Sequence, residues 1–185
     1  DFKFLSDTSK KIFDREALLG VSITGWMNNP EILFDEKILQ KGAKIVKEVN
    51  KEVAAILGIN AAARTTCVKP SGNASVLLQT ASGIHAEHSN MYIRNVQMNK
   101  ESEITQAIMK TNPYMVEDSV WSAGGTDVVV SFPILPKKGS MYKDDLLGVK
   151  HLELVKKAQK HWVEAGTNED LCADKGVRHN VSNTI

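Results

Sequence analysis

The sequence has little of three features that mark particular classes of protein. It has only two cysteines, Cys67 and Cys172, which excludes a secreted fold held together by several disulfides. No apolar run approaches the roughly 18–20 residues of a membrane span, and no signal peptide opens the chain. The 23 basic and 22 acidic side chains nearly balance, so there is no excess charge to favour nucleic acid or an anionic membrane as a partner.

Aromatic side chains are also few, at 6% of the 185 residues, so aliphatic side chains must fill most of the core. The length fits one domain or a large piece of one. Together these features predict a cytoplasmic protein of mixed α/β structure. The chain opens at Asp1 without a methionine and stops at Ile185, inside a segment from Val181 that reads as the start of a strand. We therefore expect a fragment of a longer protein.

Strand and helix patterns alternate along the chain. Apolar runs predict strands at 18–25, 64–68, 91–98 and 127–132, and helical spacing predicts helices at 36–57, 73–79, 103–112 and 143–165. Asp35 and Gly58 are suitable caps for the first of these helices. The last should bury Leu147, Leu152, Val155, Ala158 and Trp162 and leave His151 and His161 solvated or at an interface. This alternation predicts parallel strands covered by helices, in a single unit over residues 1–185.

The segment Thr65-Thr-Cys-Val-Lys-Pro-Ser-Gly-Asn-Ala-Ser75 is the most informative. A strand ends there, Pro70 and Gly72 force a turn, and hydroxyl and amide side chains open a helix. Such a turn directs free backbone N–H groups and the positive end of a helix dipole at one point, which suits a phosphate. Ser71 and Ser75 could add hydroxyl donors, and Lys69 could neutralise charge. The alternative is an ordinary capped helix, because the spacing matches neither a P-loop nor a dinucleotide fingerprint.

Two further groups could carry chemistry. His85 and His88 have His-x-x-His spacing and could bind a metal with Glu87 or Cys67, but third and fourth ligands are not indicated, so we predict no metal site. Cys67 lies on a predicted buried strand and should pack as a small apolar side chain. Cys172 lies in a polar loop with no evident disulfide partner, so neither cysteine is a candidate site residue.

Five stretches resemble, in the same order, segments of adenosylcobalamin-dependent (class II) ribonucleotide reductases. They are Gly20-Val-Ser-Ile-Thr-Gly25, Lys69-Pro-Ser-Gly-Asn-Ala-Ser75, Ser82-Gly-Ile-His-Ala-Glu-His88 with Tyr92-Ile-Arg94, Val129-Val-Ser-Phe-Pro-Ile134 and Asn180-Val-Ser-Asn-Thr-Ile185. They span nearly the whole chain. The resemblance is closest to the ribonucleoside-triphosphate reductase branch, because diphosphate-using relatives more often have Pro-Thr-Gly-Thr in the second stretch.

The resemblance implies a fold and a set of site residues. The fold is a ten-stranded α/β barrel made of two five-stranded parallel halves, with this chain forming most of the second half, the C-terminal part of the catalytic barrel. The residues implied to hold the substrate phosphates are Pro70, Ser71, Gly72, Asn73, Ala74 and Ser75, with Asn73 where threonine is commoner. Lys69, His85 and His88 are implied to lie at the mouth of the barrel.

The resemblance also implies an activity. Members of this family reduce ribonucleoside triphosphates to 2′-deoxyribonucleotides with a cysteine thiyl radical generated from adenosylcobalamin, and a thioredoxin-like or glutaredoxin-like protein returns the electrons. Their radical cysteine and catalytic glutamate lie in an Asn-x-Cys-x-Glu motif, which this chain lacks. We therefore expect that motif upstream and the fragment alone to be inactive. Half a barrel would also expose an apolar face, so self-association is expected.

Three other interpretations stay open on the sequence. One is a phosphate- or nucleotide-binding α/β module without radical chemistry, which would keep the segment at 69–75 and lack the radical cysteine elsewhere. Another is the barrel of a diiron-dependent ribonucleotide reductase, which shares the same fold. A purely structural α/β domain, with an ordinary capped helix at Ser71, is the third reading.

Overall fold

The structure is a computed structural model that describes residues 3–184. It divides into two compact units rather than the single unit expected from the sequence. The first contains the residues up to Glu87 and those from Lys137 onward, and the second contains His88–Pro136. The sequence gives no sign of this division because no linker rich in glycine, proline or serine marks either junction.

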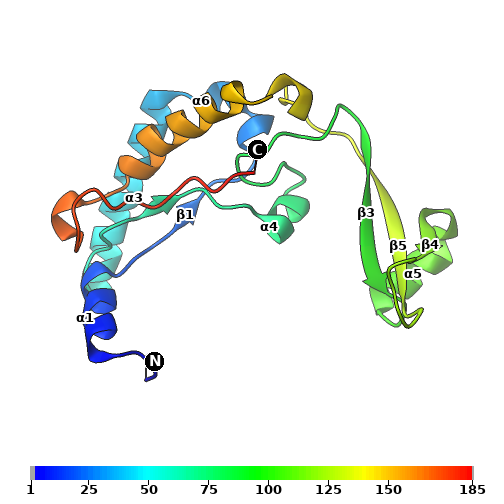
Figure 1. Cartoon of the computed structure of the whole chain (residues 1–185), viewed down its shortest axis with the longest axis horizontal. Helices are drawn as coiled ribbons and strands as arrows, with labels where there is room; N and C mark the ends of the chain where they lie inside the picture. The colour runs from blue at the N-terminus through cyan, green and yellow to red at the C-terminus, as the bar shows by residue number, and fades with distance from the viewer. Residues whose placement is uncertain (1–2, 185) are drawn as a thin grey trace. The chain divides into compact units, whose positions relative to one another are not determined.

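The first unit contains most of the helices (Figure 1). In chain order its elements are α1 (Asp7–Glu16), β1 (Val21–Ser22), the 3-10 turn η1 (Trp26–Asn28), α2 (Pro30–Leu33), α3 (Glu36–Leu57), β2 (Thr66–Cys67), α4 (Gly72–Leu77), the 3-10 turn η3 (Lys143–Asp145), α6 (Val149–Ala158), the π-helical segment η4 (Gln159–Glu164) and the 3-10 turn η5 (Glu169–Leu171). No helix within residues 3–184 is long and apolar enough to cross a membrane.

Three parallel segments form the middle of this unit. β1 pairs with β2 in parallel register, with Val21 opposite Thr66, and an isolated parallel bridge joins Val68 to Val181. The expected strand near Val181 is thus reduced to one bridge, and Ile185 lies outside the described residues. Because the three segments are parallel, their carboxyl ends meet at one edge.

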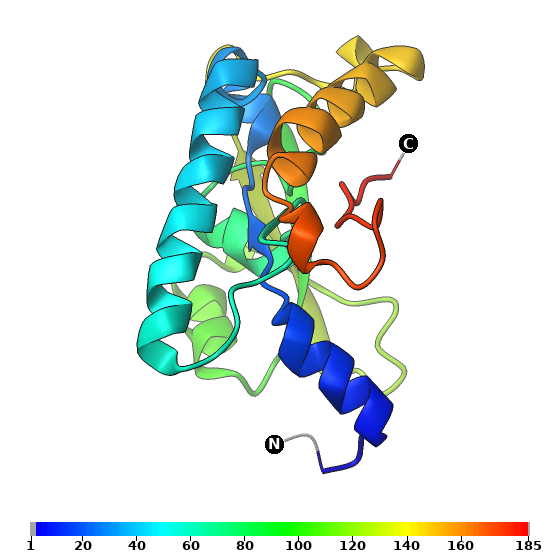
Figure 2. The ribbon, with the colours of Figure 1, turned by 90° about the vertical axis from the view of Figure 1, so that its left-hand side faces the viewer.

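The helix α3 forms where the sequence predicts it. The Asp35 carboxylate accepts the N–H of Ile38 at 2.9 Å, and Gly58 ends the helix with a φ of 67°. Its inner face packs against the end of the α6 region, where a Cβ at Gly42 would lie 3.3 Å from the Trp162 ring (Figure 2). Much of its apolar surface stays open, with Val49 at 51% and Val53 at 45% exposure.

The core of the first unit lies between these helices and the parallel segments. Trp162 donates its indole N–H to the carbonyl oxygen of Cys67 at 3.0 Å, which joins the C-terminal helix to β2. A second hydrogen bond joins the same two elements: the Thr66 hydroxyl of β2 donates to the carbonyl oxygen of Trp162 at 2.6 Å. The buried apolar side chains around this contact include Trp26, Met27, Leu39, Ala43, Val68, Ile84, Ala158 and Val163.

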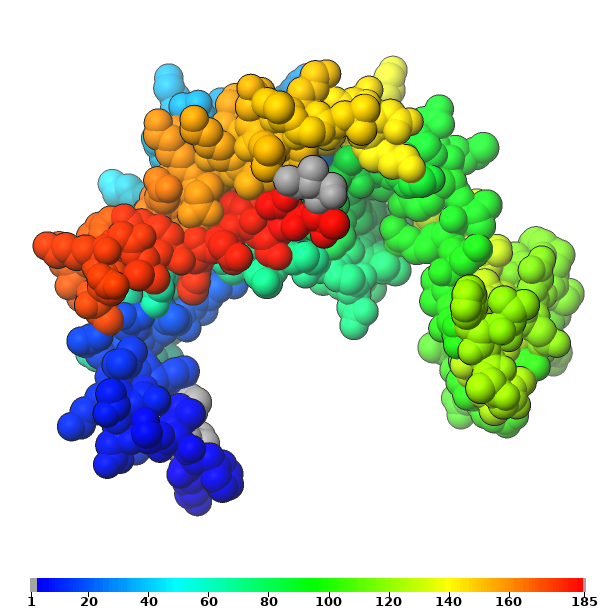
Figure 3. Space-filling view, viewed as in Figure 1, coloured from blue at the N-terminus to red at the C-terminus, as the bar shows by residue number. Residues whose placement is uncertain are grey.

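The predicted long helix at 143–165 is interrupted. Gly148, with a φ of 56°, separates the turn η3 from α6, because this left-handed conformation cannot continue a helix. The interruption changes which side chains are buried: Leu147 and Leu152 are exposed, contrary to prediction, whereas His151 and His161 are buried. Beyond α6, the C-terminal segment lies against this helix, where Gln159 hydrogen-bonds the backbone of His179 and Val181 (Figure 3).

The second unit is a small antiparallel sheet with one short helix. Its elements are β3 (Tyr92–Asn99), α5 (Glu103–Thr111), the 3-10 turn η2 (Pro113–Met115), β4 (Val116–Asp118) and β5 (Asp127–Ile134), in the sheet order β3-β5-β4. The prediction that these strands are parallel is wrong. The physical reason is visible in β3, where half-buried and exposed residues alternate; such strands suit an antiparallel sheet with one open face, whereas parallel strands are buried on both faces.

Candidate functional site

The candidate site lies at the carboxyl edge of the three parallel segments. Thr24 follows β1 at this edge, the turn at Pro70 follows β2, and Thr184 follows the bridge at Val181. In sheets of this kind, ligands bind outside the carboxyl ends of the strands, where the loops converge. The segment predicted to hold phosphate is therefore on the side of the sheet where a ligand is expected.

The backbone of the predicted phosphate segment faces outward. Gly72, Asn73 and Ala74 are exposed and form the first turn of α4, whose N–H groups have no carbonyl partner within the helix. No side chain caps this helix, and Ser71 precedes it as the N-cap residue. The N–H of Ser71 donates instead to the hydroxyl of Ser82 at 2.8 Å, which fixes the start of the turn.

Ser75 does not present its hydroxyl to the outside. Its side chain is buried and donates to the carbonyl oxygen of Ser71, one turn earlier. The hydroxyl hydrogen expected to face a phosphate is therefore used inside the turn. The donors that remain at this end of α4 are the backbone N–H groups, the Ser71 hydroxyl and the Asn73 amide.

Two hydrogen bonds of the Thr24 side chain hold the loop after α4 in place. The N–H of Gly83 donates to the Thr24 hydroxyl at 2.8 Å, and that hydroxyl donates to the carbonyl oxygen of Ala81 at 3.0 Å. Gly83 has a φ of 55°, and a Cβ there would lie 2.8 Å from the carbonyl oxygen of Lys69. A side chain at this position would separate the two ends of the loop, so glycine is required.

Sequence reasoning missed a buried polar cluster behind the loop. The side-chain amide of Asn28 donates to Glu87 at 2.8 Å and to the hydroxyl of Ser140 at 3.0 Å. Its carbonyl oxygen accepts the Thr80 hydroxyl at 2.5 Å and the N–H of Ala81 at 2.7 Å. Asn28 thus fills its hydrogen-bonding capacity and joins three segments that are distant in the chain.

The three residues predicted at the barrel mouth have different surroundings. Lys69 is exposed, and its backbone N–H donates to the Ser22 hydroxyl at 3.0 Å. His85 is half-buried in the first unit, while His88 is exposed in the second and stacks edge-on against Tyr92 with ring centres 5.7 Å apart. Among residues 3–184, no three His, Cys, Asp or Glu side chains gather as metal ligands.

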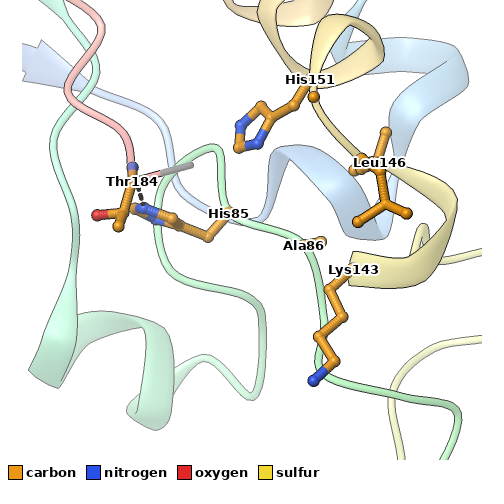
Figure 4. Close-up of a pocket in the computed structure, with 8 residues that line it drawn as sticks. His85, Ala86, Lys143, Leu146, His151 and Thr184 are labelled. Atoms are coloured by element: carbon orange, nitrogen blue, oxygen red, sulfur yellow. Dashed lines mark hydrogen bonds between the residues drawn. The ribbon is translucent and has the colours of Figure 1, made fainter.

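His85 lines a cavity of about 310 Å³ in the first unit (Figure 4). Its Nδ1–H donates to the carbonyl oxygen of Ser82 at 2.8 Å, and its Nε2 accepts the N–H of Thr184 at 3.0 Å. Both ring nitrogens are therefore used, and the proton is on Nδ1. Because Ser82 also binds Ser71, His85 is connected to the start of α4 through one residue.

Neither cysteine has the character of a reactive thiol. Burial raises the pKa of the Cys67 thiol, with the positive charge of Lys69 opposing it. Burial also raises the pKa of Cys172, opposed by Arg64. Both are free thiols, and a raised pKa keeps them protonated at neutral pH, whereas nucleophilic or disulfide-exchange chemistry needs the thiolate.

Comparison with known proteins gives the fold class first. A solved B12-dependent class II ribonucleotide reductase matches 84% of this chain with a TM-score of 0.71 and 17% sequence identity. The match covers 26% of that enzyme's chain, so this protein has the fold of one part of a class II reductase. The mixed α/β class predicted from the sequence is confirmed.

The sequence relatives are more specific. A Dictyostelium discoideum protein named "Probable adenosylcobalamin-dependent ribonucleoside-triphosphate reductase" is 30% identical over 163 residues, which is 85% of this chain and 21% of the relative. The adenosylcobalamin-dependent ribonucleoside-triphosphate reductase of Euglena gracilis is 24% identical over 169 residues, 90% of this chain and 23% of its own. No family model matches. The resemblance to these reductases is confirmed, and the chain spans about a fifth of its relatives' length.

Proposed function

We propose that this chain is the substrate-phosphate part of an adenosylcobalamin-dependent ribonucleoside-triphosphate reductase and forms the second half of its ten-stranded catalytic barrel. The observation that carries the proposal is the exposed first turn of α4 at the carboxyl edge of parallel strands, in the segment Lys69-Pro-Ser-Gly-Asn-Ala-Ser75. Both named relatives are triphosphate reductases, which supports a ribonucleoside triphosphate as the substrate.

In this proposal the chain positions the substrate and supplies no radical. The N–H groups of Gly72, Asn73 and Ala74 donate to phosphate oxygens, with the Ser71 hydroxyl and the Asn73 amide beside them. The positive end of α4 favours the negative charge of the phosphates. Pro70, which cannot donate, sets the turn, and the buried Ser75 stabilises it by its bond to Ser71.

The remaining chemistry belongs to the rest of the parent enzyme. Adenosylcobalamin, held by other parts of the parent, would supply the radical chemistry, and no residue of this chain is assigned to hold it. Neither Cys67 nor Cys172 lies in an Asn-x-Cys-x-Glu context. We therefore propose that the 185-residue chain is inactive alone and that the parent acts in the cytoplasm with a thioredoxin-like or glutaredoxin-like reductant.

One rival has an observation in its favour. A phosphate-binding module without radical chemistry needs only the turn at 69–75, and that turn is complete within this chain. The two functions differ in the parent protein, where only a reductase has a radical cysteine. A diiron-dependent reductase has no such support, because both sequence relatives are named for adenosylcobalamin.

A substitution that adds one negative charge to the first turn of α4 tests the proposed phosphate site. In the parent enzyme, Asn73→Asp places a carboxylate beside the substrate phosphates and should raise the KM for the triphosphate at least about tenfold, or ~1.4 kcal/mol. The same substitution should not destabilise the fold, because an acidic residue is favourable in the first turn of a helix. The control is Asn90→Asp, an identical change at an exposed residue of the second unit. Equal KM values for the two variants would show that residues 70–75 do not bind the substrate phosphates.

A further inference from the structure

The long strand β3 of the second unit has one edge with which no strand of residues 3–184 pairs. It pairs with β5 along its whole length, and the sheet order β3-β5-β4 makes it an edge strand (Figure 1). An unpaired strand edge presents backbone N–H and C=O groups that can bind a further strand. The function proposed above does not use this edge.

The register of the sheet shows which backbone groups face the open edge. The N–H of Lys100 donates to the carbonyl oxygen of Thr126 at 2.8 Å, on the β5 side. Backbone groups alternate in direction along an antiparallel strand. The even-numbered residues of β3 therefore bond β5, and the N–H and C=O groups of the odd-numbered residues point away from it.

The open stretch of this edge is bounded at both ends. The Ser89 hydroxyl donates to the carbonyl oxygen of Met91 at 2.6 Å, and the N–H of Ser102 donates to that of Asn99 at 3.2 Å. Between these bonds, three alternate and exposed residues have N–H and C=O groups without a hydrogen-bond partner among residues 3–184: Ile93, Asn95 and Gln97.

Side chains do not cover these six groups. The Asn95 side chain accepts the Ser131 hydroxyl at 2.9 Å, and the Gln97 amide donates to the Asp127 carboxylate at 2.8 Å. Both side chains are therefore directed across the sheet to β5, and the backbone of β3 stays open at its edge.

The opposite edge of the sheet is protected, whereas this one is not. β4 pairs with β5 only as far as Val130, and Pro133 lies beyond it. The N–H of Ser119 donates to the carbonyl oxygen of Asp127 at 3.1 Å, so the odd-numbered residues of β5 face the β4 side, where Pro133 removes a donor. β3 has no proline, lysine or β-bulge, which are the usual guards of a strand edge.

We propose that β3 pairs with β3 of a second copy of this chain, antiparallel and centred on Asn95. In this register the two Asn95 residues face each other, and Ile93 faces Gln97 of the second copy. The N–H and C=O groups of these residues point to the shared edge in both copies, so all six groups of each copy are hydrogen-bonded. Two three-stranded sheets then become one sheet of six strands.

Other registers leave poorer contacts. Centring the pairing on Arg94 would place the guanidinium groups of the two copies opposite each other. Centring it on Val96 would require the carbonyl oxygen of Asn99, which already accepts the N–H of Ser102. Centred on Asn95, Arg94 instead lies opposite Val96 of the second copy, and no like charges of β3 face each other.

This contact does not depend on the reductase function, because all its residues belong to the second unit. It is also separate from the apolar face of α3, where Val49 is exposed. Every variant in the test therefore carries Val49→Lys, which suppresses association through α3 and leaves the β3 edge as the contact that is measured.

Sedimentation equilibrium of the 185-residue chain measures the dimer. We expect a monomer–dimer equilibrium whose dissociation constant rises about fivefold or more with Asn95→Lys, because two ammonium groups then face each other. Gln106→Lys adds the same charge at an exposed position of α5 and should leave the dissociation constant unchanged. Both substitutions are at exposed residues, and circular dichroism checks that each variant is folded.

Cysteine cross-linking tests the register. Two directly opposite, hydrogen-bonded residues have Cα atoms about 5.5 Å apart, which is within reach of a disulfide. With oxidised glutathione as the oxidant, Asn95→Cys should form a disulfide between two copies, whereas Gln97→Cys, which faces Ile93, should not. Peptide mapping separates this disulfide from any formed by Cys67 or Cys172.

Three results would overturn the proposal. The first is a folded chain that stays monomeric at high concentration. The second is a dimer with the same dissociation constant for Asn95→Lys and Gln106→Lys, which would mean that another surface forms the contact. The third is equal cross-linking at positions 95 and 97, which would mean that the two strands have no fixed register.

Discussion

The side-chain amide of Asn28 donates to the Glu87 carboxylate at 2.8 Å, with both residues buried and 59 positions apart in the chain. The same side chain binds Thr80 and Ala81, which lie in the loop after the helix α4. Asn28 therefore connects the loop after α4, and through it the proposed phosphate segment, to the body of the first unit.

Asn28→Ala should destabilise the chain strongly. The substitution leaves Glu87, Ser140 and the N–H of Ala81 without this partner in a buried site, which costs on the order of 3 kcal/mol. Urea unfolding followed by circular dichroism measures the change. Asn73→Ala, at an exposed asparagine, is the control and should cost less than about 1 kcal/mol. A loss for Asn28→Ala no larger than the control's would mean that the buried cluster contributes little.

Glu16→Gln should also lower stability, because the buried Glu16 carboxylate is the partner of the half-buried Arg64 guanidinium. Glu16 is 5% exposed, contacts Arg64 directly and accepts the N–H of Ala173 at 2.7 Å. Removing its charge leaves Arg64 uncompensated and should cost about 3 kcal/mol. Glu48→Gln breaks a surface pair with Lys44 at 3.8 Å and should cost under about 0.5 kcal/mol. Similar unfolding midpoints for the two variants would contradict this role for Glu16.

Stability should fall in mild acid because of His151. Burial lowers the pKa of His151, the neighbouring His85 lowers it further, and a hydrogen bond to the Ile84 backbone partly opposes both. Below the ordinary histidine value of about 6.5, the unfolded chain therefore binds more protons than the folded chain, so the free energy of unfolding decreases as pH falls. Unfolding by urea between about pH 7.5 and 5.5 measures the slope. His151→Asn should flatten it, and an unchanged slope would assign the effect to other groups.

The apolar face of α3 should make the isolated chain self-associate. Leu18, Leu19, Ile45, Val49 and Val53 line an open apolar hollow of about 500 Å³ between α3 and the segment before β1. In the proposed parent enzyme, other parts of the longer chain would cover this surface. Light scattering should therefore show dimers or larger species of the chain, reduced by Val49→Lys. Val120→Lys, at a 90% exposed valine of the second unit, should have no such effect. A monomeric chain at high concentration would contradict the expectation.

Local signals explain what could be predicted from the sequence. The bounds of α3 follow from Asp35 and Gly58, which act through their own backbone neighbours, and the start of α4 follows from Pro70 and Gly72 in the same way. The antiparallel pairing of β3 with β5 depends on contacts between residues such as Val96 and Val130, which no local pattern specifies.

The buried polar groups were not predictable for the same reason. Asn28 and Glu87 become partners only when the loop after α4 folds back on η1. On a continuous helix from 143 to 165, His151 is predicted at the surface. In the structure Gly148 interrupts that helix, and His151 lies on the buried side of α6. Ser75 matches the family motif, yet its hydroxyl is directed to Ser71.

The central claim is that this chain belongs to a cobalamin-dependent triphosphate reductase, and an assay of the full-length parent tests it most directly. The purified parent is incubated with a ribonucleoside triphosphate and a dithiol reductant, with and without adenosylcobalamin, and the deoxyribonucleotide product is measured. We predict product only when adenosylcobalamin is present, and its loss when the cysteine of the Asn-x-Cys-x-Glu motif expected in the parent is replaced by alanine. Triphosphate binding without any product, or equal product without the cobalamin, would contradict the claim.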